Sequence, residues 1–144
     1  MDDPRIVDWL RLQRHNLSTL FIESAQSGDF PGYGSLSPLS LKAVTDRMAR
    51  TLIYHADRDE EALQATETLH RRQAAALTAD VSILEKLAFI EERFARVRAR
   101  VASDGETEPY REELLKRIGE AARYAKITTR SVELDRKMAE LSGE

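Results

Sequence analysis

The sequence contains no cysteine, which excludes disulfide bonds, thiolate nucleophiles and cysteine-ligated zinc or iron–sulfur centres. Aromatic residues make up only 6% of the 144 residues, so the core must rest mainly on Leu, Ile, Val and Ala, as in helical bundles. Neither sign of charge dominates, because the formal net charge is −3. That balance favours neither a nucleic acid nor a membrane as partner, and we expect neither.

Long apolar runs are also missing. No window of about 18 apolar residues exists, so no segment is predicted to span a membrane. The N-terminus opens with two acids and a proline and lacks the basic start and apolar run of a signal peptide. These features predict a cytoplasmic protein. The length suits one domain over residues 1–144, with a bundle over about 4–132 and a C-terminal helix extension over about 127–142.

Strand signals are absent, since no run alternates with period two. We therefore predict an all-α fold, a helical bundle of four to six helices with a long C-terminal helix. A haem-free globin-like arrangement is compatible with this length. Four capping residues mark helix starts. Asp3 and Ser37 precede prolines, while Asp57 with Glu60 and Ser82 with Glu85 match the capping box, in which the Glu side chain returns to the backbone N–H of the capping residue. The sequence leaves open whether the helices beginning after Ser37 and Asp57 are continuous.

Between the first two predicted helices lies a segment rich in Gly and Pro. The first helix is predicted to end at Gly28, and residues 28–40 form a loop in which Phe30 and Tyr33 tuck against the bundle. A third helix is expected to place four residues on one side, Leu63, Thr66, His70 and Leu77.

The clearest periodicity belongs to the fourth predicted helix. Apolar residues repeat there with spacings of 4, 3, 4, 3 and 4, a heptad seam made of Ile83, Leu87, Ile90, Phe94, Val97 and Val101. Four arginines are interleaved with it, at positions 93, 96, 98 and 100. We interpret most of them as the solvated flank of the seam, because Phe94, Val97 and Val101 form its buried side. Glu91 and Glu92 lie within one turn and can pair with these arginines. Nucleic-acid binding has little support without an aromatic stacking platform.

The last helix is predicted from Pro109 to about Leu141, and its apolar face changes along its length. One stripe comprises Tyr110, Leu114, Ile118, Ala121, Ala125 and Val132; a second, offset stripe comprises Ile127, Leu134, Met138 and Leu141. The second stripe is surplus to one bundle, so it predicts a homodimer in which this helix contributes and both chain ends lie on one side. The alternative is that the C-terminal turns fray.

His15 raises the question of phosphotransfer. It lies opposite the apolar face of the first predicted helix and is expected to face water, as a phospho-acceptor must. Asn16 follows it where an acid usually stands in kinase phospho-acceptor segments, and no Gly-rich ATP-binding segment is present. A pure phosphotransfer bundle stays open beside an ordinary surface histidine.

The other two histidines fall on apolar helix sides and are interpreted as buried polar or ligand-contacting residues. Glu67 and His70 match half of a di-iron motif, but neither His15 nor His55 follows a Glu by three positions. We therefore expect no metal and no cofactor. Catalysis is not expected either, because no phosphate-binding loop, dinucleotide fingerprint or Ser/His/Asp ordering is found.

The order of segments resembles a known family. It runs from IVDWLRLQRHNLSTLFIESA through a Pro-containing loop and LKAVTDRMARTLI to LHRRQAAALTADVSILEKLAFIEERFARVRARV and ELLKRIGEAARYAKITTRSVE. This resembles the N-terminal sensory domain of RsbR/RsbRD-type stress-signalling co-antagonists over roughly residues 5–132, although Ala79-Asp80 stands where a Gly is usual. The resemblance implies a bacterial, haem-free dimeric module whose final helix transmits a signal to a protein output partner. The competing readings are the His15 phosphotransfer bundle and a structural adaptor or chaperone-like bundle.

Overall fold

The computed structural model describes residues 3–70 and 75–143, and within them every regular element is a helix. The elements are α1 (Pro4–Leu12), α2 (Arg14–Ala25), α3 (Pro31–Gly34), α4 (Pro38–Asp57), α5 (Glu60–Leu69), α6 (Ala75–Leu77), α7 (Ile83–Ser103), the 3₁₀ helix η2 (Gly105–Tyr110) and α8 (Arg111–Leu141). The prediction of an all-α bundle with a long C-terminal helix is confirmed.

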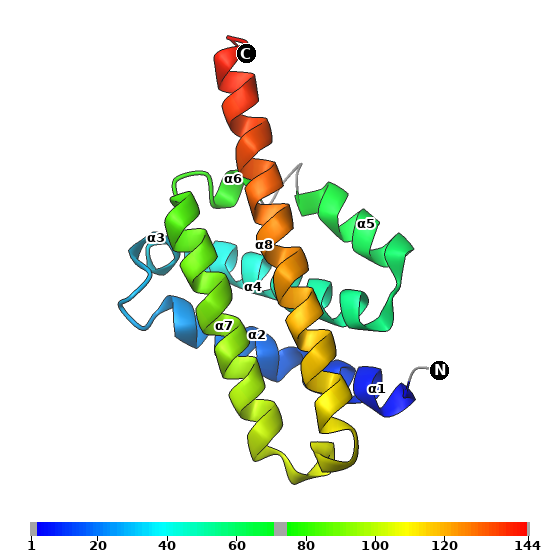
Figure 1. The fold of residues 1–144 in the computed structure, drawn as a ribbon. Helices are drawn as coiled ribbons and strands as arrows, with labels where there is room; N and C mark the ends of the chain where they lie inside the picture. Colours follow the sequence, from blue (N-terminus) through cyan, green and yellow to red (C-terminus); the bar gives the residue numbers. More distant parts are fainter. Residues whose placement is uncertain (1–2, 71–74, 144) are drawn as a thin grey trace.

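Two layers of helices cross one another (Figure 1). The antiparallel pair α7 and α8, joined by η2, lies across α1, α2 and α4, while α5 flanks α4. The C-terminal turns of α8 project beyond the rest of the molecule. None of the described helices combines the length and apolar character needed to cross a membrane.

The core lies between these layers. Of the α7 seam, Ile90, Phe94, Val97 and Val101 are buried as predicted, whereas Ile83 and Leu87 are half-buried at the start of the helix. Phe89 lies outside the predicted seam and is nevertheless fully buried. α7 contacts both α8 and α2, so its buried face is wider than one heptad seam.

In the segment 28–40 the two aromatic residues pack against the bundle as predicted, but the segment is not a loop throughout, since it contains α3 and the first residues of α4. Phe30 and Tyr33 are buried with their ring centroids 5.1 Å and 4.3 Å from that of Phe89. The Glu85 carboxylate accepts the backbone N–H groups of Gly32 (3.1 Å) and Tyr33 (2.9 Å). Ser82 caps α7 as predicted, accepting Glu85 N–H at 3.1 Å. The Glu85 side chain, expected to return to Ser82, holds α3 instead.

The first predicted helix is divided, which corrects the sequence-based prediction. Asp3 caps it as expected, but α1 ends at Leu12 and Gln13 adopts φ −88° and ψ 0° before α2 begins. The side chain of Gln13 accepts the Arg100 Nε–H at 2.9 Å. Because of the break, α1 packs against α4 and η2, whereas α2 packs against α4 and α7. These contacts are between distant parts of the chain, so no local sequence pattern predicts the break.

The predicted capping box at Asp57 and Glu60 is wrong. Asp57 is the last residue of α4 and accepts from Arg11 at 2.8 Å. Arg58 then adopts a left-handed conformation, with φ 57°, and Asp59 caps α5 by accepting Ala62 N–H at 3.1 Å. α4 and α5 are therefore separate helices. Leu77 lies in α6, apart from α5; residues 71–74 of the predicted third helix lie outside the described residues.

Along α8 the two predicted apolar stripes have different environments. Leu114, Ile118 and Ala121 of the first stripe are buried. The second stripe is exposed in the single chain, at 65% for Ile127, 60% for Leu134, 61% for Met138 and 87% for Leu141.

Candidate functional site: a cationic pocket beside the C-terminal helix

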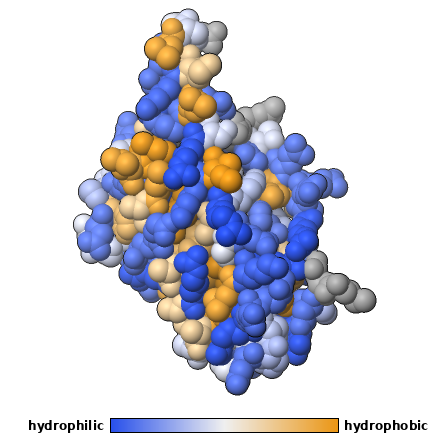
Figure 2. All heavy atoms as spheres, viewed as in Figure 1, coloured by the Kyte–Doolittle hydropathy of each residue, from blue (hydrophilic) through white to orange (hydrophobic). Residues whose placement is uncertain are grey.

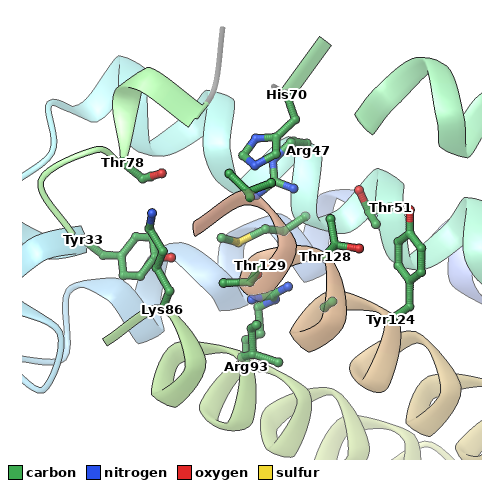
Figure 3. Close-up of a pocket in the computed structure, with 14 residues that line it drawn as sticks. Tyr33, Arg47, Thr51, His70, Thr78, Lys86, Arg93, Tyr124, Thr128 and Thr129 are labelled. Carbon is green, nitrogen blue, oxygen red and sulfur yellow. The ribbon is translucent and has the colours of Figure 1, made fainter. Parts of the chain in front are cut away.

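A small cavity lies where α4, α7 and α8 meet (Figure 3). Its volume is about 60 Å³. The described residues that line it come from α4 (Arg47, Met48, Thr51), α7 (Lys86, Ile90, Arg93) and α8 (Tyr124, Ala125, Thr128, Thr129, Val132), with Tyr33, His70 and Thr78 completing the wall. None of them is acidic.

Arg93 is the most unusual of these residues, because it is a buried charge. Its exposed fraction is 6%, and its Nε has no hydrogen-bond partner. The guanidinium carbon lies 5.1, 5.8 and 5.9 Å from the ring centroids of Phe94, Phe21 and Phe89. Aromatic rings at these distances offset part of the desolvation cost of a cation, but they do not accept hydrogen bonds as an oxygen does.

Arg47 approaches the same space from α4, and Figure 3 shows both guanidinium groups directed toward it. Arg47 is half-buried, and its Nε also lacks a partner. Within residues 3–70 and 75–143, Arg47 and Arg93 form no hydrogen bond or ion pair. This differs from most buried charges in proteins, which are paired.

Burial shapes the charges of the site. It lowers the pKa of Arg93 to about 9, with a further contribution from the like charge of Arg47. It lowers the pKa of Arg47 to about 10 and also lowers the pKa of Lys86. The two arginines therefore remain cationic at neutral pH. Burial raises the pKa of Tyr33 to about 12, so this phenol is neutral and supplies no counter-charge.

The nearby carboxylates are engaged elsewhere. Glu67 accepts from the Tyr124 hydroxyl at 2.8 Å, and Glu133 pairs with Arg136 at 3.0 Å. Glu85 holds the backbone of α3. Lys86 still feels the charge of Glu133, but in the described part of the chain no carboxylate faces Arg47 or Arg93.

The predicted histidines are distributed over the molecule. His70, at the end of α5, lines the pocket. His55 is half-buried on α4 with its ring centroid 4.9 Å from that of Tyr124, and burial lowers its pKa. Glu67 bonds to Tyr124, and the described residues contain no cluster of three or more His, Asp or Glu side chains suited to a metal ion.

His15 lies exposed on α2, as its helical position predicted, and it does not line the pocket. The exposed stripe residues Ile127, Leu134, Met138 and Leu141 also lie outside the pocket, although they share α8 with Thr128, Thr129 and Val132.

Sequence reasoning missed the central pair of the pocket. Arg93 stands between Ile90 and Val97 of the heptad seam, and Arg47 directly precedes Met48, which is buried on α4. The sequence pattern that could indicate such a buried arginine is a cation at the edge of an apolar helix stripe. Many solvent-exposed arginines occupy the same kind of position, so the pattern does not distinguish the two cases.

No protein-family model, curated protein or solved structure matches this chain. Its function has to be argued from the geometry of the pocket and of α8.

Proposed function

We propose that this chain is a non-enzymatic sensory module in which the state of the pocket is relayed through α8 to a dimer interface. One observation carries the proposal: the same helix lines the pocket, through Tyr124, Thr128 and Thr129, and presents the exposed stripe that includes Leu134 and Met138.

The relay uses the stiffness of a continuous helix. α8 runs 31 residues from Arg111 to Leu141. A change at Thr128 or Thr129 shifts or rotates the following turns as a unit, because packed helices move as rigid elements between discrete arrangements. Val132, the last lining residue from α8, lies two positions before Leu134 of the exposed stripe.

A second copy of the chain is the proposed partner of the stripe. Ile127, Leu134 and Leu141 are spaced by seven residues, and Met138 lies one turn after Leu134. This is the spacing of a helix–helix seam. Burying each such side chain is worth roughly 1.5–3 kcal/mol, and two-fold symmetry is the commonest way for identical faces to meet. Hydrophobic residues are visible on the projecting end of the molecule in Figure 2.

The resemblance to RsbR/RsbRD-type sensory domains supports the same proposal. It implies a dimeric, haem-free, globin-like or bundle-shaped module in a cytoplasmic stress-signalling complex, with the final helix leading to a protein output partner. The projection of α8 beyond the bundle suits such a helix (Figure 1).

Sedimentation at micromolar concentration tests the dimer. The wild type should be dimeric, and Leu134→Glu combined with Met138→Glu should be monomeric with its helical content retained in circular dichroism. Leu12→Glu combined with Leu39→Glu is the matched control, because these leucines are 81% and 79% exposed outside α8. A monomeric wild type, or a dimer indifferent to charges in the stripe, would contradict the proposal.

Phosphotransfer through His15 is the second candidate, favoured by the exposure of this side chain on α2. Incubation with a phosphorylated receiver domain distinguishes the two functions. The sensory module should acquire no acid-labile phosphate, and His15→Ala should leave its folding and dimerisation unchanged. Acid-labile phosphate that disappears in His15→Ala would establish the phosphotransfer function instead. A stable complex with an unrelated protein and no self-association would favour an adaptor.

A further inference from the structure

We propose that the pocket between α4, α7 and α8 binds a small monocarboxylic acid, with its carboxylate held by Arg93 and Arg47. The inference rests on the sensory function proposed above and deepens it, since it names the chemical class of the signal.

The charge of the pocket calls for an anion. Arg93 is 94% buried, it is directed into the cavity, and its Nε has no acceptor. Arg47 faces the same space, and the two like charges repel one another. A carboxylate between them supplies both missing acceptors and relieves the repulsion. Arginine forks match carboxylates through paired, charge-assisted hydrogen bonds.

The rest of the lining favours a carboxylate over a phosphate. Ten of the fourteen described lining residues are polar, but Met48, Ile90, Ala125 and Val132 contribute apolar surface to the wall. A phosphate presents acceptor oxygens in every direction, so some of them would face this apolar surface without a donor. A carboxylic acid fits this division, because its charged end meets the arginines while its short hydrocarbon end contacts the apolar side chains.

The size of the cavity limits the ligand. About 60 Å³ is available, and one water molecule needs roughly 10–15 Å³ of such space. The cavity therefore has room for roughly four to six non-hydrogen atoms, which corresponds to an acid of roughly two to four carbon atoms. The hydroxyl groups of Thr128 and Thr129, both on α8, line the same cavity and can donate to a carboxylate oxygen. Binding would therefore tie α8 to the arginines of α4 and α7.

The test is a calorimetric and NMR titration of the full chain with sodium acetate, propionate and butyrate. Sodium chloride at equal ionic strength controls for screening, and sodium phosphate is the competing anion. At least one acid should bind saturably and shift the Arg93 Nε–H resonance. The proposal is overturned if none of the three acids saturates beyond chloride, or if phosphate binds more tightly than every acid.

Matched variants localise the binding. Arg93→Met should weaken the acid at least ten-fold, whereas Arg98→Met, which removes an exposed arginine of the same helix, should bind as the wild type does. Arg93→Lys keeps the charge but loses the planar guanidinium, so its affinity for the acid should lie between those of the wild type and Arg93→Met. If Arg93→Met does not fold, Arg47→Met is measured instead, and it too should weaken binding of the acid at least ten-fold. Wild-type affinity in the folded arginine-to-methionine variant would refute the site.

The outcomes separate this inference from the proposed function. A dimer that requires Leu134 and Met138 but binds no acid leaves the relay standing and removes the ligand class. A monomer that binds the acid through Arg93 leaves the site standing and removes the dimeric relay.

Discussion

The two ends of the α7–α8 pair differ in how their buried polar groups are bonded. At the end joined by η2, the Trp9 indole N–H donates to Asp104 at 2.8 Å and the Thr107 hydroxyl donates to the Val101 carbonyl at 2.8 Å. Arg117, 2% exposed, donates to the Ala56 carbonyl at 2.5 Å and pairs with Glu113 at 3.3 Å. At the pocket end, Arg93 is almost as deeply buried, but within the described part of the chain its charge is stabilised only by contacts with aromatic rings.

Arg117 and Arg93 thus show two uses of one residue type. Arg117 satisfies a carbonyl in the last turn of α4, where a helix leaves such groups without internal partners. Its burial stabilises the chain's own fold. Arg93 bears a desolvation cost that the described protein atoms offset only in part, and the proposed carboxylate would relieve the remainder. The following predictions test this difference, from the largest effect to the smallest.

Phe94→Ala should cause the largest loss, because Phe94 is buried in the core that both ends share. Truncation of a fully buried phenylalanine costs about 3–5 kcal/mol. Urea unfolding followed by circular dichroism measures the change in unfolding free energy. A loss under about 1 kcal/mol would mean that this part of α7 does not pack as described.

Arg117→Met should destabilise the joining end by about 2–3 kcal/mol, because it leaves the buried Ala56 carbonyl without its donor. The same urea unfolding experiment applies. Lys116→Met, on the exposed neighbour, is the control and should be nearly neutral. An Arg117→Met variant as stable as wild type would show that the bond contributes nothing.

In the absence of ligand, Arg93→Met should leave the free energy of unfolding unchanged or raise it by up to about 1 kcal/mol. Removing the buried charge recovers part of its desolvation cost, and the lost cation–π contacts, worth roughly 0.5–2 kcal/mol, offset most of that gain. Parallel unfolding curves of Arg93→Met and Arg117→Met make the comparison directly. Equal losses in both variants would abolish the distinction between the two ends.

The smallest effect concerns pH and the joining end. The Trp9 indole N–H, followed by the backbone N–H of Glu106, holds the pKa of Asp104 below its ordinary value of 3.8. A carboxyl whose folded-state pKa is lowered contributes stability above its unfolded-state pKa, and the contribution disappears as pH falls through the folded-state value. Trp9, the only tryptophan, reports this by fluorescence. Asp104→Asn should unfold with a shallower acid dependence; an unchanged profile would contradict the assignment.

Much of the fold is local and could be predicted. Asp3, Ser37 and Ser82 cap their helices because their side-chain oxygens reach backbone N–H groups two or three residues ahead. The buried half of the α7 seam and the first stripe of α8 follow from helical periodicity, which depends only on neighbours along the chain. The exposure of His15 follows from the same geometry.

Features set by distant contacts could not be predicted in this way. Gln13 breaks the first predicted helix where Arg100, 87 positions later, bonds to its side chain. Arg58 adopts a left-handed conformation rarely taken by non-glycine residues, which moved the cap of α5 from the expected Asp57 to Asp59.

The sequence by itself determined an all-α chain, its main helix starts and a long last helix with two apolar stripes, because these depend on caps and on a 3.6-residue period. Only the tertiary structure decided that Arg47 and Arg93 face one cavity. Helical position places an arginine beside an apolar stripe, but whether that edge meets water or another helix depends on packing. Here α7 is covered by both α2 and α8, so the edge that carries Arg93 is buried and its charge becomes part of a pocket.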